Sequence, residues 1–99
     1  KVVEQRDVCV ERIRSIDGLE VQSSGGAFYM FVKLTDEKWA LDDKQFVLDL
    51  LHEEHVLVVH GSGFSPELGR GHFRIVYLPE VGVLNEAFDR IERFLIRHR

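Results

Sequence analysis

The chain has 99 residues, of which 44% are hydrophobic and 30% are charged, with 13 basic and 17 acidic side chains. This composition is typical of one globular domain and excludes a disordered chain, and the scattered, slightly acidic charge argues against a nucleic-acid interface or a polybasic membrane patch. No apolar run is long enough to span a membrane, and the single cysteine, Cys9, cannot form an internal disulfide. We therefore expect a soluble, cytoplasmic protein that binds neither nucleic acid nor a membrane.

The first predicted element is a helix that starts with the chain. Apolar residues at positions 2, 3, 9, 10, 13 and 16 fall near one helical face, and Gly18 can end the helix in a left-handed conformation. Cys9 lies within the apolar part of this pattern, which predicts a buried and unreactive thiol. No capping Ser, Thr, Asp or Asn precedes the helix, and the chain begins with Lys1. We therefore expect residues 1–99 to be a single domain of a longer polypeptide.

The next segments alternate between strands and helices. Residues 19–22 predict a short strand, and residues 27–34, which are rich in β-formers, predict a longer one. Residues 35–43 are polar and predict mostly loop, with Trp39 and Leu41 in the core. Asp42 or Asp43 can then cap a helix that runs to about Glu54, because its apolar residues recur at helical spacing.

Two further strands are predicted at residues 56–59 and 73–78, and an amphipathic helix ends the chain. That helix has one apolar face, made of Leu84, Ala87, Phe88, Ile91 and Leu95. The order α-β-β-α-β-β-α predicts an α+β fold in which helices pack on a small mixed sheet.

Arg74 is the residue of this pattern that most needs an explanation. It stands between Phe73 and Ile75 in a strand whose other residues are mostly apolar and predict burial. A buried cation without an anionic partner costs several kcal/mol by an order-of-magnitude estimate. A structural ion pair with a carboxylate is one explanation. The other is a binding role, because arginine holds a carboxylate through two parallel hydrogen bonds.

Two other motifs predict chemistry only weakly. Glycines recur at positions 61, 63, 69 and 71, but a phosphate loop must lead from a strand into a helix, whereas here Pro66 intervenes and a strand follows. His52, His55 and His60 could bind a metal, but HEEH is not the HExxH pattern, and histidines near the end of a helix also face the negative end of its dipole. A connecting loop and ordinary helix-end histidines are therefore favoured.

Three segments together resemble a known family. They are GGAFYMF at residues 25–31, VLVVHGSGF at residues 56–64 and HFRIVYLP at residues 72–79, followed by an amphipathic helix. In order and spacing they resemble the C-terminal small domain of fold-type I, pyridoxal-phosphate-dependent aminotransferases, and within that family the alanine aminotransferase group. One departure is His60, where many relatives carry proline.

The resemblance implies roles for two residues. Arg74 matches the arginine that binds the α-carboxylate of the amino acid and 2-oxo acid substrates, and Phe64 matches an aromatic residue beside the substrate. The cofactor implied is pyridoxal phosphate, whose covalent lysine, acidic partner and phosphate-binding residues belong to the large domain of the same chain. Lys33, Lys38 and Lys44 lie outside the family's lysine motif. The parent protein is thus expected to be a homodimeric aminotransferase and residues 1–99 alone to be inactive.

An alternative from another functional class is a stand-alone regulatory module that senses an amino acid without catalysis. Such a module needs neither a cofactor nor a second domain. The uncapped first helix and the absence of a starting methionine argue against it. A cofactor-binding lysine upstream in the full-length sequence would distinguish the two.

Overall fold

The computed structural model describes residues 2–23, 29–61, 70–77 and 79–98. In chain order the elements are α1 (Val2–Ser15), β1 (Leu19–Ser23), β2 (Tyr29–Leu34), α2 (Glu37–Ala40), α3 (Asp43–Glu54), β3 (Val59–His60), β4 (His72–Val76) and α4 (Val81–Arg97). None of these helices is long and apolar enough to cross a lipid bilayer. The predicted α+β class is confirmed.

The four strands form one sheet in the order β1-β2-β4-β3. All three pairings between the described strands are antiparallel, so the prediction of a mixed sheet is wrong. β2 and β3 run in the same direction, but β4 lies between them and is antiparallel to both. The last strand thus inserts into the sheet, an arrangement that depends on contacts between distant segments.

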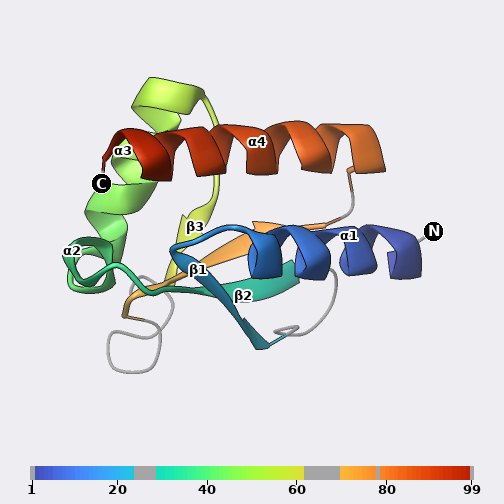
Figure 1. The fold of residues 1–99 in the computed structure, drawn as a ribbon, viewed down its shortest axis with the longest axis horizontal. Helices are drawn as coiled ribbons and strands as arrows, with labels where there is room; N and C mark the ends of the chain where they lie inside the picture. The colour runs from blue at the N-terminus through green and yellow to red at the C-terminus, as the bar shows by residue number, and fades with distance from the viewer. Residues whose placement is uncertain (1, 24–28, 62–69, 78, 99) are drawn as a thin grey trace.

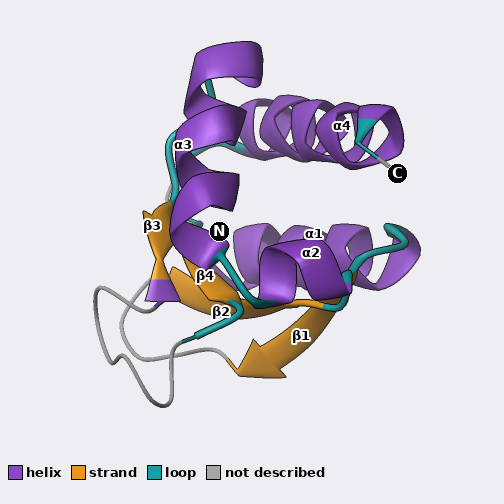
Figure 2. Cartoon of the chain, turned by 90° about the vertical axis from the view of Figure 1, so that its left-hand side faces the viewer, coloured by secondary structure: helices purple, strands orange, loops and turns teal. Residues whose placement is uncertain are grey.

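The helices gather on one side of this sheet. In Figure 1, α4 runs above α1, and Figure 2 shows the helices mainly above the sheet and the strands below them. No described helix covers the opposite face. The sheet therefore has a covered face, which we define by Met30, Val32, Phe73 and Ile75, and an open face, which carries the alternate residues of β2 and β4.

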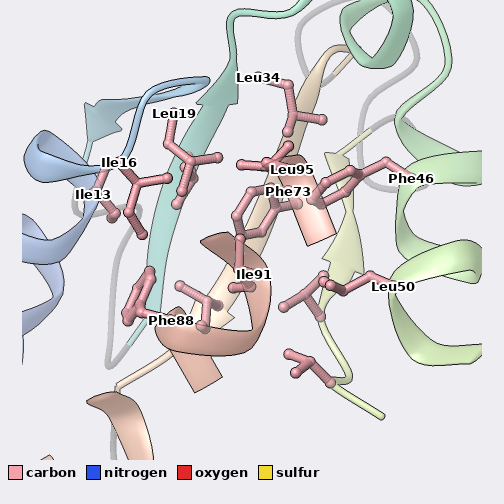
Figure 3. Close-up of a cluster of buried hydrophobic side chains, with 14 of the residues drawn as sticks. Ile13, Ile16, Leu19, Leu34, Phe46, Leu50, Phe73, Phe88, Ile91 and Leu95 are labelled. Atoms are coloured by element: carbon pink, nitrogen blue, oxygen red, sulfur yellow. The ribbon is translucent and has the colours of Figure 1, made fainter. Parts of the chain in front are cut away.

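The covered face and the helices share one hydrophobic core. Phe73 of β4 stacks on Phe46 of α3 at a ring distance of 5.4 Å, and Phe46 meets Phe94 of α4 edge to face at 5.4 Å. Figure 3 shows Phe73, Phe88 and Ile91 projecting into the same interior. α4 contributes five buried residues, Leu84, Phe88, Ile91, Phe94 and Leu95. Each such side chain contributes roughly 1.5–3 kcal/mol through burial.

Two helix boundaries agree closely with the sequence. α1 ends at Ser15, and Gly18 takes a positive φ of 110° just beyond it. Asp42 caps α3, because its carboxylate accepts a hydrogen bond from the Gln45 amide at 3.1 Å. Both boundaries follow from residues within a few positions of the helix end.

Two other segments differ from prediction. Residues 35–43 contain the short helix α2, capped by Asp36, and Trp39 is buried as expected whereas Leu41 is 61% exposed. The strand predicted at residues 56–59 is paired only at Val59 and His60, and Leu57 is 76% exposed. The apolar run at residues 56–59 therefore predicts a strand but does not specify which of its residues pair with a neighbouring strand.

Candidate functional site

Arg74 lies on the open face of the sheet. In β4 the buried residues Phe73 and Ile75 alternate with half-buried Arg74, as expected for a strand with one covered face. The register places Arg74 between Phe31 of β2 and Val59 of β3. The expectation that this cation lies inside a fully buried strand is therefore wrong, and the desolvation argument for a buried counter-ion no longer applies.

Aromatic side chains share this face with Arg74. The Arg74 guanidinium carbon lies 4.6 Å from the centre of the Tyr29 ring, within the range of a cation–π contact. Tyr29 meets Phe31 edge to face at 6.2 Å, and Phe31 meets His72 in the same way at 6.4 Å. We call these four residues, Tyr29, Phe31, His72 and Arg74, the open-face cluster. It combines a cation with flat apolar surfaces, which suits a small carboxylate ligand.

A groove adjoins Arg74 at the β3 edge of the sheet. It has a volume of about 430 Å³ and lies between the segment before β3, β4 and the first turns of α4. Several of its apolar lining residues are exposed, namely Leu57, Val59, Val76 and Val83. Arg74 therefore lies where the open face meets an apolar depression.

The second predicted site residue, Phe64, lies outside the described residues, as do residues 25–28 of the first family motif. Of the four loop glycines, the structure describes Gly61 and Gly71. Gly71 has a φ of +79°, and a Cβ there would come within 2.9 Å of the Ala40 carbonyl oxygen. This glycine is thus required by backbone conformation and by close packing on α2.

The three histidines do not converge. His52 and His55 are exposed on and after α3, and His55 takes a left-handed conformation at its C-terminus. His60 instead approaches the buried carboxylate of Asp43, with 3.8 Å between its Nδ1 and the Asp43 Oδ2. Among the residues that the structure describes, no three His, Cys, Asp or Glu side chains are placed to hold a metal ion. The geometry therefore offers no support for the histidine-metal alternative.

The sequence reading missed two buried carboxylates. Asp43 is 2% exposed and accepts a hydrogen bond from the Gly71 amide at 3.3 Å, so it ties α3 to the start of β4. Glu54, 5% exposed, pairs with Arg93 at 2.6 Å and with Arg97 at 2.9 Å. The arginines at positions 90, 93 and 97 recur at helical spacing, and this row of cations on one helix face could have predicted an acidic partner.

Contacts with residues of α4 and with His98 lower the pKa values of Glu54 and Glu53. The hydrogen bond from Arg93, with a further one from Arg97, lowers the pKa of Glu54 from 4.5 to about 2, although burial opposes the shift. The pKa of Glu53 is also lowered, first by its hydrogen bond with His98 and then by Arg97. Both carboxylates lie at the end of α3 and hold α4 against it, so their role is structural.

Cys9 is fully buried in the core, and burial raises the pKa of its thiol to about 11. The prediction of a buried thiol is confirmed. A protonated thiol without solvent access is a poor nucleophile. Cys9 is therefore assigned to packing.

The described lysines are surface residues. Lys33, Lys38 and Lys44 are all exposed, and Lys38 lies 4.7 Å from the centre of the Trp39 ring on α2. None of them lines the groove beside Arg74.

Comparisons with known proteins give the family. The family model described as aminotransferase class I and II matches residues 1–91. Glutamate-pyruvate aminotransferase AlaA of Haemophilus influenzae is 43% identical over 103 residues, covering 100% of this chain and 24% of that protein. The alanine aminotransferase of Mycobacterium tuberculosis is 37% identical, covering 100% of this chain and 23% of that protein.

Solved structures agree. Alanine aminotransferase from Pyrococcus furiosus matches with a TM-score of 0.89 and 48% identity, covering 100% of this chain and 24% of that chain. An aminotransferase from Escherichia coli matches with a TM-score of 0.85 and 38% identity, covering 95% of this chain and 23% of that chain. The chain thus spans about a quarter of the length of these relatives. These matches support the aminotransferase interpretation over the amino-acid-sensing module, and the chain belongs to the class I and II aminotransferases.

Proposed function

We propose that this chain forms the C-terminal small domain of a pyridoxal-phosphate-dependent aminotransferase, in which Arg74 binds the α-carboxylate of the substrates. The observation that carries the proposal is the position of Arg74 on the open face, over the Tyr29 ring and beside an apolar groove. Family membership supplies the reaction class, the transfer of an amino group between an amino acid and a 2-oxo acid.

Arginine suits this role for a geometric reason. Its guanidinium presents a rigid fork that matches both oxygens of a carboxylate, so one residue fixes position and orientation together. The amino acid and the 2-oxo acid both carry this carboxylate, so Arg74 serves both halves of the reaction. Holding the reacting carbon in place can lower a barrier by several kcal/mol, on the order of 7 in the best cases.

Pyridoxal phosphate supplies the electron sink for this chemistry when it is bound. The described residues do not fit its attachment, because the described lysines are exposed and lie outside the groove. We therefore assign cofactor binding to the large domain of the parent chain and substrate orientation to this one.

The resemblance supports further parts of the proposal. Phe64 is proposed as an aromatic contact beside the substrate. Relatives are named for alanine or for glutamate and pyruvate, and one matched structure is named for aspartate, so alanine and aspartate are the proposed amino donors. The parent protein is proposed to be a cytoplasmic homodimer, and light scattering of the full-length protein would measure its oligomeric state.

The central test replaces Arg74 in the full-length enzyme. Arg74→Ala should leave a folded protein that still binds its cofactor, while kcat/KM falls at least about a hundredfold for both substrates, roughly 3 kcal/mol of lost transition-state stabilisation. Arg74→Lys keeps the charge but loses the fork, so it should also be impaired. If Arg74 makes only a structural ion pair, melting temperature will fall instead, and a folded Arg74→Ala enzyme with near-normal kcat/KM would sink the proposal.

A second test addresses the isolated chain. Residues 1–99 mixed with pyridoxal phosphate should show no transamination and no specific covalent attachment after borohydride reduction and mass spectrometry. Stoichiometric modification of one lysine would contradict the assignment of cofactor binding to another domain.

A further inference from the structure

The guanidinium of Arg74 lies over the ring of Tyr29. In the β2–β4 register Tyr29 faces Val76 and Phe31 faces Arg74, so Tyr29 and Arg74 are diagonal neighbours. Diagonal pairs on one face are within reach of an aromatic ring and a long side chain. The 4.6 Å between the Arg74 guanidinium carbon and the ring centre places the cation in the attractive field of the ring.

The ring is itself supported by its neighbours. Phe31 meets Tyr29 at a ring distance of 6.2 Å and an angle of 82°, and His72 meets Phe31 at 6.4 Å and 90°. Edge-to-face contacts of this kind stabilise aromatic pairs beyond the area they bury. Tyr29 is also half-buried at the start of β2. These contacts and the partial burial favour one orientation of the ring.

We infer that Tyr29 is a positioning residue, whose ring fixes the Arg74 guanidinium in the orientation that receives a substrate carboxylate. The inference rests on the proposed function of Arg74. Arginine loses considerable rotamer freedom when it is immobilised, and a side chain that is ordered before the ligand arrives loses less on binding. The ring thus improves substrate binding without touching the substrate.

This role predicts a particular kinetic pattern. Without the ring Arg74 is still present and still holds the carboxylate of the bound substrate, so the cost of ordering its side chain should appear in KM and leave kcat nearly unchanged. The effect should be the same for every substrate, because each presents the same carboxylate to Arg74. A purely structural role would instead lower the melting temperature and leave the KM of the folded enzyme unaltered.

The experiment compares two variants of the full-length enzyme with pyridoxal phosphate bound. Tyr29→Leu removes the ring and should raise the KM of the amino acid and of the 2-oxo acid about three- to tenfold, with kcat changed less than about twofold. Tyr29→Phe keeps the ring and should stay within about twofold of the unmodified enzyme. Lys33→Ala, on the same strand and face, is the matched control, and melting curves accompany every variant.

A double-mutant cycle isolates the coupling. In the Arg74→Ala background, Tyr29→Leu should have no further effect on KM, because the cation that the ring holds is gone. If Tyr29→Leu does not fold, Tyr29→Val replaces it, since a β-branched residue suits a strand.

The outcomes separate this inference from the proposed function. An unchanged KM in a folded Tyr29→Leu enzyme overturns the inference while leaving Arg74 its role, provided that Arg74→Ala is impaired. Equal impairment of Tyr29→Phe and Tyr29→Leu also overturns it, because the hydroxyl would then carry the effect. A normal kcat/KM in Arg74→Ala overturns the proposed function itself.

Discussion

The two faces of the sheet are built from alternate residues of the same strands, yet their environments are opposite. On the covered face Phe73 is fully buried against the rings of α3 and α4. On the open face its neighbour Arg74 is half-buried over Tyr29. Adjacent positions in one strand are thus assigned to the core and to the candidate site. Substitutions at Phe73 and at Arg74, one residue apart, should therefore separate the stability of the fold from the proposed binding role of the open face.

The largest expected effect is on the covered face. Phe73→Ala should lower the free energy of unfolding by about 3–5 kcal/mol, because it leaves a cavity under the Phe46 ring. Denaturant titration of the 99-residue chain, followed by the fluorescence of its single tryptophan, Trp39, measures this. Arg74→Ala is the paired control and should cost less than about 1 kcal/mol. Equal losses of unfolding free energy at Phe73 and Arg74 would contradict the assignment of stability to the covered face.

A smaller loss is expected where the chain rejoins the sheet. Gly71→Ala should cost about 1–3 kcal/mol, because Gly71 has a φ of +79° and a Cβ there would approach the Ala40 carbonyl oxygen at 2.9 Å. Gly82 in α4 has no heavy atom within 4 Å of an added Cβ. Gly82→Ala should therefore be neutral or stabilise by about 0.5–1 kcal/mol. Thermal melts of both variants measure the change in stability. A Gly71→Ala chain as stable as the unmodified one would show that α2 can move away from the added Cβ at little cost.

The buried glutamate at the end of α3 should matter more than an exposed one that also pairs with an arginine of α4. Glu54→Gln removes the charge held by Arg93 and Arg97, at a cost of about 1–2 kcal/mol. Glu86→Gln removes the exposed partner of Arg90 and should cost about 0.3–0.5 kcal/mol. Chemical denaturation at pH 7 measures both, and similar losses would mean that burial of Glu54 contributes little.

Glu54 also predicts an acid dependence of stability. Its pKa falls from 4.5 to about 2 on folding, so its contribution is complete above 4.5 and is lost as the pH falls towards 2. In a pH series of unfolding curves, Glu54→Gln should flatten the slope across this window. An unchanged slope would assign the acid dependence to other carboxylates.

The smallest effect is expected at the exposed pair of Glu20 and Lys33, which face each other across β1 and β2. Lys33→Ala should change the free energy of unfolding by about 0.5 kcal/mol or less. Added salt should reduce the difference further. A loss comparable to that of Gly71→Ala would show that the open face contributes to stability as well.

Local patterns predicted much of the fold. The Asp42 cap, the end of α1 before Gly18 and the burial of Cys9 all follow from spacing along the chain. The sequence also singled out Arg74. It did not reveal which way this side chain faces, because an apolar run with one charged residue is compatible with burial on both sides or on one.

The other errors have the same origin. The run at residues 56–59 has the composition of a strand, but pairing depends on which segment lies beside it, and β4 reaches only Val59 and His60. The short helix α2 was missed because four residues give too little periodicity to detect. Phe64 stays a prediction from family resemblance.

The sequence by itself determined the three longer helices, the approximate positions of most strands, the buried thiol and the family, since each depends on neighbouring residues or on motif order. Only the tertiary structure decided the antiparallel order β1-β2-β4-β3, the binding of Glu54 by Arg93 and Arg97, and the place of Tyr29 under Arg74. The pairing of β2 with β4 and the contacts of Glu54 with α4 join residues 39 to 47 positions apart. Such contacts are selected by the packing of the whole core, which no local pattern specifies.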